Sequence, residues 1–290
     1  MFKAKRRPGS KSAAAMAKAS LDNWLRSPRT VLFVIFTVAQ CYVQSRGFLD
    51  MSASRPQPMR YLESLFYLLG TGGHLTRISL LFLITVSEIP RRIGFQNLML
   101  IRGSRARWLL SQVSYCLWLA LLMTALVALL FSVFLLPAAG RGPGFSETAL
   151  IAADILRPEE ALVPEYVRLH FIPFTACLAA LAPLALFWFT MVLLILLCGL
   201  MGAPRLGVVL YAFLLVLHMT LLDTSFIPFT LPLPAAYATL LSILSGEPGK
   251  EGARLARALA GYTAVIAIFA AALFARVRRA DLLFSPENRF

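Results

Sequence analysis

The sequence predicts an all-α, polytopic membrane protein, and three observations support this prediction. Apolar residues make up 59% of the 290 residues and the mean hydropathy is +0.73, whereas soluble domains contain roughly 45–50% apolar residues. Several apolar stretches approach the length of about 20 residues that a helix needs to cross a bilayer. Charged residues stand between these stretches, so the net charge of +14 reflects membrane topology rather than nucleic-acid binding.

Six apolar segments are the expected transmembrane helices, near residues 29–45, 64–87, 108–136, 171–201, 206–222 and 259–275. The second segment contains the stretch LLGTGGHLTRISLL, which places glycines, His74 and Arg77 in mid-membrane. We therefore expect a kinked helix there that faces protein rather than lipid. We expect residues 1–28 to form a separate unit, in which a basic tail leads into an amphipathic helix in the membrane interface. Its apolar face is expected to hold Ala17, Leu21, Trp24 and Leu25. The alternative is a basic tail that only enforces the topology.

The distribution of lysine and arginine predicts that both termini are cytoplasmic. With six spans, the cytoplasmic pieces hold 18 of the 28 Lys and Arg residues, and the outer loops hold nine. A seventh span at residues 225–244 would place the basic C-terminal tail outside, and three prolines interrupt its first half. We expect a re-entrant outer hairpin there, before the last span. In the outer loop 137–170, a helix is expected with Ser146 as its N-cap.

The sequence contains no signature of a membrane enzyme. A phosphate-binding loop of the form G-x-x-x-x-G-K-S/T is absent, so we do not expect this chain to hydrolyse ATP. The three histidines are isolated from one another, which does not favour paired metal ligands. We expect no catalytic residue, bound cofactor or metal on this chain. The four cysteines lie in apolar segments and are expected to be buried thiols, namely Cys41, Cys116, Cys177 and Cys198.

Polar residues within the apolar segments are candidates for a translocation pathway, because polar groups are costly in hydrocarbon. The candidates are His74, Arg77, His218 and Asp223. Each also has a structural interpretation. Arg77 would pair with a neighbouring carbonyl or carboxylate, His218 would be a hydrogen-bonded core residue, and Asp223 would mark the outer interface.

The loop EIPRRIGFQNLMLIRGSRARW, residues 88–108, sets apolar residues among its arginines. Pro90 near its start and Gly103 near its end delimit a short surface helix. One interpretation is a cytoplasmic connector whose arginines only follow the positive-inside rule. A docking helix explains more, since Phe95 and Leu98 would be unnecessary in a purely topological connector.

This loop resembles the first cytoplasmic loop of the permeases of type-2, export-type ATP-binding-cassette (ABC) transporters. An apolar segment is followed by a glutamate, a short glycine-bearing helix, an arginine-rich stretch and a long apolar span. The residues that carry the match are Glu88, Arg91, Arg92, Gly94, Phe95, Asn97, Leu98, Arg102, Gly103, Ser104, Arg105, Arg107 and Trp108. The layout of interfacial helix, six spans, inside termini, short second cytoplasmic loop and re-entrant hairpin is also similar. The polar second segment and the long outer loop 137–170 depart from the pattern.

The resemblance implies that residues 29–290 are a permease domain that exports an amphipathic or hydrophobic substrate, such as a peptide, antibiotic or lipid-like molecule. It implies a second permease subunit, identical or homologous, and cytoplasmic ATPase subunits that bind ATP and Mg²⁺, in a bacterial cytoplasmic membrane. Residues 88–107 would be the coupling helix, with ATPase contacts at Glu88, Arg91, Arg92, Gly94, Phe95, Asn97, Leu98 and Arg102. The alternative is an ATP-independent polytopic protein: a secondary transporter, a membrane enzyme or an immunity factor.

Overall fold

The computed structural model is built of helices. It describes residues 13–53, 59–70, 72–87, 89, 105–136, 145–146, 165–223 and 251–279. Within these ranges every secondary-structure element is a helix, so the all-α prediction is confirmed there. The helices are α1 (Ala13–Leu25), α2 (Pro28–Ala53), α3 (Tyr61–Gly70), α4 (Gly72–Val86), α6 (Arg105–Leu135), α8 (Glu165–His170), α9 (Pro173–Leu200), α10 (Pro204–Asp223) and α12 (Glu251–Arg279).

Four of these helices are long and apolar enough to cross a membrane. Their apolar spans are Pro28–Asp50 in α2, Arg105–Leu135 in α6, Pro173–Leu200 in α9 and Gly252–Arg278 in α12. They contain 23, 31, 28 and 27 residues, and a crossing needs about 20. All four coincide with predicted transmembrane segments, and they indicate a membrane-embedded protein.

Shorter apolar helices occupy the second and fifth predicted segments. In the second, α3 ends at Gly70 and α4 begins at Gly72, so the expected interruption is a break between two helices. The apolar parts of α4 and α10 are Thr76–Val86 and Pro204–Leu217. A total of six spans therefore stays a prediction. The expected hairpin at 225–244 lies outside the described residues.

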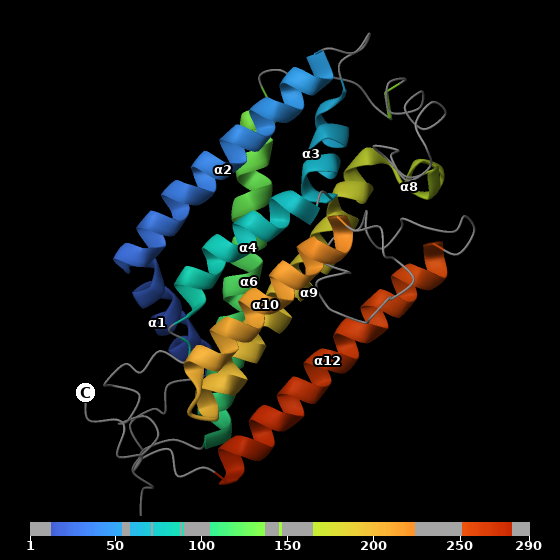
Figure 1. The fold of residues 1–290 in the computed structure, drawn as a ribbon. Helices are drawn as coiled ribbons and strands as arrows, with labels where there is room; N and C mark the ends of the chain where they lie inside the picture. The colour runs from blue at the N-terminus through green and yellow to red at the C-terminus, as the bar shows by residue number, and fades with distance from the viewer. Residues whose placement is uncertain are drawn as a thin grey trace, which may run out of the picture.

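Helix α9 is the central helix of the bundle. It packs against α3, α4, α6, α10 and α12, and α6 packs in turn against α1, α2, α3 and α12. Figure 1 shows α2 and α12 on opposite sides of the α6 and α9 pair. Within its apolar span α9 is 67% buried, whereas α12 is 17% buried, so α12 is a peripheral helix. Because α9 has no charged residue, it can be surrounded by other helices on most of its surface.

The turn between α9 and α10 brings these helices close together. Gly202 has φ of 85°, a left-handed conformation that glycine adopts without steric strain. Its N–H donates to the Gly199 carbonyl at 3.2 Å and the Ala203 N–H donates to the Cys198 carbonyl at 3.0 Å, the Schellman arrangement of a helix end. Four residues beyond this turn, a Cβ at Gly207 would lie 3.0 Å from the backbone of α9. Glycine therefore permits a close approach of the two helices at this point.

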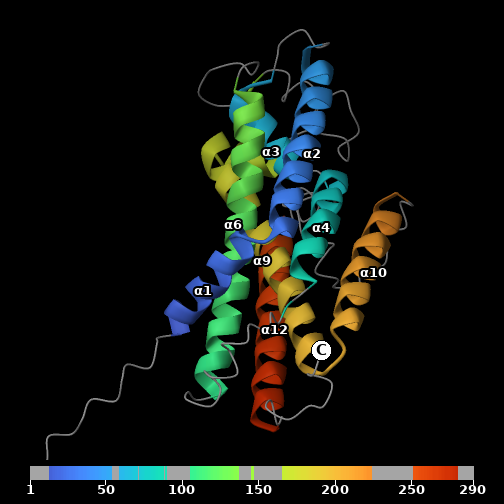
Figure 2. The ribbon, with the colours of Figure 1, turned by 90° about the vertical axis from the view of Figure 1, so that its left-hand side faces the viewer.

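Helix α1 confirms the predicted helix before the first span, but it also makes a contact with protein. Its residues Ala17, Ser20 and Trp24 are buried, and the helix packs against α6 beside the start of α2 (Figure 2). Leu25, which we expected on the same face, is 48% exposed. The Thr30 hydroxyl of α2 donates to the Trp24 carbonyl at 2.6 Å and fixes the junction. The position of α1 in the membrane interface stays a prediction.

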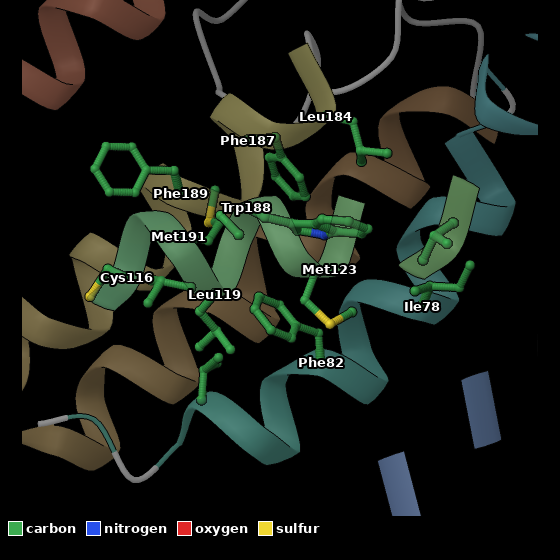
Figure 3. Close-up of a cluster of buried hydrophobic side chains, with 14 of the residues drawn as sticks. Ile78, Phe82, Cys116, Leu119, Met123, Leu184, Phe187, Trp188, Phe189 and Met191 are labelled. Atoms are coloured by element: carbon green, nitrogen blue, oxygen red, sulfur yellow. The ribbon is translucent and has the colours of Figure 1, made fainter. Parts of the chain in front are cut away.

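An aromatic cluster forms the core where α4, α6 and α9 meet. Figure 3 shows Trp188 of α9 near its centre, with Phe82 from α4 and Met123 from α6. The ring centroids of Trp188 and Phe82 are 5.8 Å apart, and Phe82 in turn lies 6.2 Å from Phe33 of α2. Each such aromatic pair is worth about 0.5–1.5 kcal/mol beyond its buried area. These rings therefore connect α2, α4 and α9 into one core.

Candidate functional site

Most residues of the predicted coupling helix lie outside the described part of the chain. These are Glu88, Arg91, Arg92, Gly94, Phe95, Asn97, Leu98 and Arg102. The structure does describe both ends of the loop. Ile89 is 1% exposed, and its N–H donates to the Val86 carbonyl of α4 at 3.0 Å. The loop therefore leaves α4 from a buried, hydrogen-bonded residue.

The other end of this loop is fixed to α12. Arg105, the first residue of α6, donates from Nη1 to the Arg278 carbonyl at 3.4 Å. Trp108, one turn further, is 6% exposed. Nearby, Arg276 of α12 donates from Nε to the carbonyl of Leu200, the last residue of α9, at 3.3 Å. The loop thus begins and ends on helices that pack against the central bundle.

The four candidates for a translocation pathway lie on two helices that pack together. His74 and Arg77 belong to α4, and His218 and Asp223 belong to α10. These helices run in opposite directions (Figures 1 and 2). The backbone positions of His74 and His218 therefore lie on the same side of the contact between Ser79 and Tyr211. The Arg77 side chain is exposed, and the side chains of the other three lie outside the described parts of the structure.

Ser79 joins three helices by hydrogen bonds. The indole Nε1 of Trp188 on α9 donates to Ser79 Oγ at 2.8 Å. The hydroxyl of Tyr211 on α10 donates to the Ser79 backbone carbonyl at 3.4 Å. All three residues are buried, and a hydrogen bond is electrostatically stronger in such a low-dielectric interior than in water. This contact fixes α4, the helix that leads into the loop, to α9 and α10.

Glu63 is a fully buried acidic residue at the start of α3. Its Oε2 accepts the Arg60 N–H at 3.1 Å and the Ser146 hydroxyl at 2.7 Å, and its Oε1 accepts the Ser146 N–H. The bond from Arg60 is that of a helix capping box, in which the N3 glutamate accepts the N-cap N–H. The two bonds from Ser146 attach residues 145–146 to α3. Ser146 thus donates to Glu63, and the helix that we expected beyond it lies outside the described residues.

A second contact near the start of α3 connects this helix to α9. The thiol of Cys177 donates to the Leu62 carbonyl at 3.2 Å, so the first turn of α3 is bonded to both α9 and residue 146. The four cysteines are free and buried, as predicted. No group of three His, Cys, Asp or Glu side chains that could hold a metal ion exists among the described residues.

Several buried polar atoms of α2 have no hydrogen-bond partner within the described ranges. They are the Thr37 hydroxyl, both ends of the Gln44 amide and the Ser45 hydroxyl. Thr37 and Ser45 are fully buried and Gln44 is 5% exposed. An unpaired buried polar group costs about 1–3 kcal/mol. Burial of these three polar side chains of α2 therefore has no stabilising hydrogen bond to account for it among the described residues.

Sequence reasoning missed Ser79, Trp188 and Glu63. For Ser79 the available signal was its place in a segment expected to face protein. For Glu63 it was its position three residues after the N-cap of a helix, although Arg60 replaces the serine or threonine of the usual capping pattern. Neither signal identifies the partner residue. Comparisons of the chain with protein-family models, curated proteins and solved structures return no match.

Proposed function

We propose that the chain is the transmembrane permease subunit of an ABC exporter for an amphipathic or hydrophobic substrate, driven by separate cytoplasmic ATPase subunits. The observation that carries the proposal is the residue pattern of the loop 88–108, which combines arginines with Phe95 and Leu98 between two apolar helices. The four membrane-length helices support a permease role. The absence of a phosphate-binding loop in the sequence means that ATP must be hydrolysed by a partner.

The contacts at the ends of the loop support a coupling role. A force on the loop acts on α4 through the buried Ile89 and on α6 through Arg105. Helix α4 is bonded through Ser79 to Trp188 and Tyr211, so its displacement would reach α9 and α10. Nucleotide binding by the ATPase would then shift the population between permease conformations. A second permease subunit, in this proposal, completes the pathway.

The test is affinity purification of the tagged chain from membranes, followed by measurement of the co-purified ATPase subunit and of its Mg-ATP hydrolysis. We expect Arg91→Glu with Arg92→Glu, and separately Phe95→Ala, to reduce ATPase recovery at least about tenfold, which is about 1.4 kcal/mol of docking energy. Arg46→Glu, a single charge reversal at an exposed site on α2, is the control and should retain the ATPase. Unchanged recovery and unchanged ATP hydrolysis in the loop variants would refute the proposal.

Transport in energised cells separates the proposal from an ATP-independent transporter. For the permease, substrate export stops on ATP depletion and survives an uncoupler as long as ATP is maintained. Export that survives ATP depletion and collapses with the uncoupler would instead favour a secondary transporter that uses residues such as His74, Arg77 and Asp223.

A further inference from the structure

Five exposed arginines gather at one end of the bundle, at the ends of three different helices. We name them the arginine cluster: Arg105, Arg107, Arg205, Arg276 and Arg278. The contact from Arg105 to the Arg278 carbonyl joins the start of α6 to the end of α12. The contact from Arg276 to the Leu200 carbonyl joins the end of α12 to the end of α9. Arg205 lies in the first turn of α10, five residues after Leu200 in the sequence. Figure 1 shows these helix ends together.

Contacts within the protein hold three of these arginines in place. Arg105 and Arg276 each donate to a backbone carbonyl, and the guanidinium carbon of Arg278 lies 4.5 Å from the centroid of the Phe274 ring. The Arg276 bond places a cation on the last residue of α9, where the helix dipole favours positive charge. A guanidinium has five N–H donors, so one hydrogen bond fixes Arg276 while much of its donor edge stays exposed.

The electrostatic surroundings of the cluster are uniformly positive along these helices. Helices α6 and α9 contain no acidic residue. The acidic residues of α10 and α12 are Asp223 and Glu251, and each stands at the opposite end of its helix from the cluster. Within the described residues of these four helices, no carboxylate therefore stands at the end that carries the cluster. An anionic ligand would relieve the mutual repulsion of Arg205, Arg276 and Arg278.

Exposed apolar side chains close to the arginines are typical of a membrane boundary. Leu110 follows the arginines of α6 and is 57% exposed, and Leu206 follows Arg205 and is 50% exposed. Phe274, which lies against Arg278, is 42% exposed. In a membrane-embedded chain such residues face acyl chains, and arginines next to them reach the headgroup level. A surface that met only an acidic soluble protein would not need exposed apolar side chains close to its arginines.

We propose that the arginine cluster is a binding site for the phosphate groups of anionic phospholipids in one leaflet of the membrane. Guanidinium groups bind phosphate oxygens through two parallel hydrogen bonds, which a fixed geometry favours. Positive-inside topology would need only the charges, whereas lipid binding also uses the fixed positions and the adjacent apolar surface. The proposal does not depend on the ATPase partnership.

The test measures phospholipid binding to the full chain in neutral detergent by native mass spectrometry, with phosphatidylglycerol and phosphatidylcholine as the two probes. We expect tighter binding of phosphatidylglycerol. Arg205→Gln should weaken it about fivefold, and Arg276→Gln with Arg278→Gln about thirtyfold, from about 1 kcal/mol for each arginine near the membrane surface. The control is Arg257→Gln, exposed on α12 at the opposite end of the helix, which should bind like the wild type.

Four outcomes would overturn the proposal. Equal binding of the two lipids, or wild-type phosphatidylglycerol binding in the variants, would show that the cluster does not select anionic lipid. Displacement of phosphatidylglycerol by inorganic phosphate at matched concentration would assign the site to free phosphate. Loss of ATPase recovery in the variants with unchanged lipid binding would assign it to a protein surface. If the double variant does not fold, Arg205→Gln alone decides the question, because no hydrogen bond described for the bundle depends on it.

Discussion

Replacing Glu63 with glutamine preserves the shape of the side chain but removes one of its two acceptor oxygens. In the structure, Oε1 accepts the Ser146 N–H, and Oε2 accepts both the Arg60 N–H and the Ser146 hydroxyl. A glutamine must place its NH2 group at one of these two positions. In either orientation an N–H donor then faces a backbone N–H donor, of Ser146 or of Arg60. Rotation of the amide does not relieve the conflict.

The expected loss of stability follows from the number of bonds affected. A hydrogen bond to a charged group contributes about 1.5–3 kcal/mol, and a buried donor left unpaired costs about 1–3 kcal/mol. Glu63→Gln weakens all three bonds and leaves at least one N–H unpaired. We therefore expect a destabilisation of about 2–4 kcal/mol. Ser146→Ala removes only the hydroxyl donor, for which we expect about 1–2 kcal/mol.

A double-mutant cycle on the reconstituted chain tests this reasoning. The free energy of unfolding is measured by SDS titration for the wild type, Glu63→Gln, Ser146→Ala and the double variant. Residues that share one hydrogen-bond network should show a coupling energy of at least about 0.5 kcal/mol. Asp50→Asn, an exposed acid on α2, is the control and should change stability by less than about 0.5 kcal/mol. A change in Glu63→Gln as small as in this control, or additive single effects, would refute the contact.

Three further substitutions test the interior of the bundle by the same measurement. Trp188→Phe leaves the serine hydroxyl of α4 without its donor and should cost about 1–3 kcal/mol, whereas Trp118→Phe, at a 58% exposed residue of α6, should cost little. Gly207→Val should cost about 1–3 kcal/mol by overpacking against α9, whereas Gly261→Ala, which has no atom within 4 Å of the new Cβ, should gain up to about 1 kcal/mol in helix stability. Gln44→Leu should be neutral or stabilising by about 1 kcal/mol, and a clear loss would show that the amide has a partner.

The helices were predictable from the sequence because an apolar stretch long enough to cross a bilayer can be recognised from its length and hydropathy alone. Four predicted spans coincide with long helices, and the glycine-rich break in the second segment falls between Gly70 and Gly72. Packing was less predictable. The sequence predicts that the apolar face of α1 contacts the membrane. In the structure α1 packs against α6, and its residues Ala17 and Trp24 are buried. Apolar side chains pack equally well against lipid and against an apolar protein surface. Hydropathy therefore does not distinguish a lipid-facing residue from one that is buried in protein.

Polar residues show the limit of sequence reasoning most clearly. By the cost of its charge in hydrocarbon, Arg77 ranks far above Ser79 as a functional candidate. In the structure Ser79 contributes more to helix packing than Arg77 does. The Arg77 side chain is exposed, whereas Ser79 is hydrogen-bonded to two other helices. The contribution of a polar side chain in a helical bundle depends on its partner. For Ser79 the partners are 109 and 132 residues away in the chain, and for Glu63 the partner is 83 residues away. The spacing of residues within one segment carries no information on hydrogen-bond partners so far away in the sequence. These partners can be identified only from the folded structure.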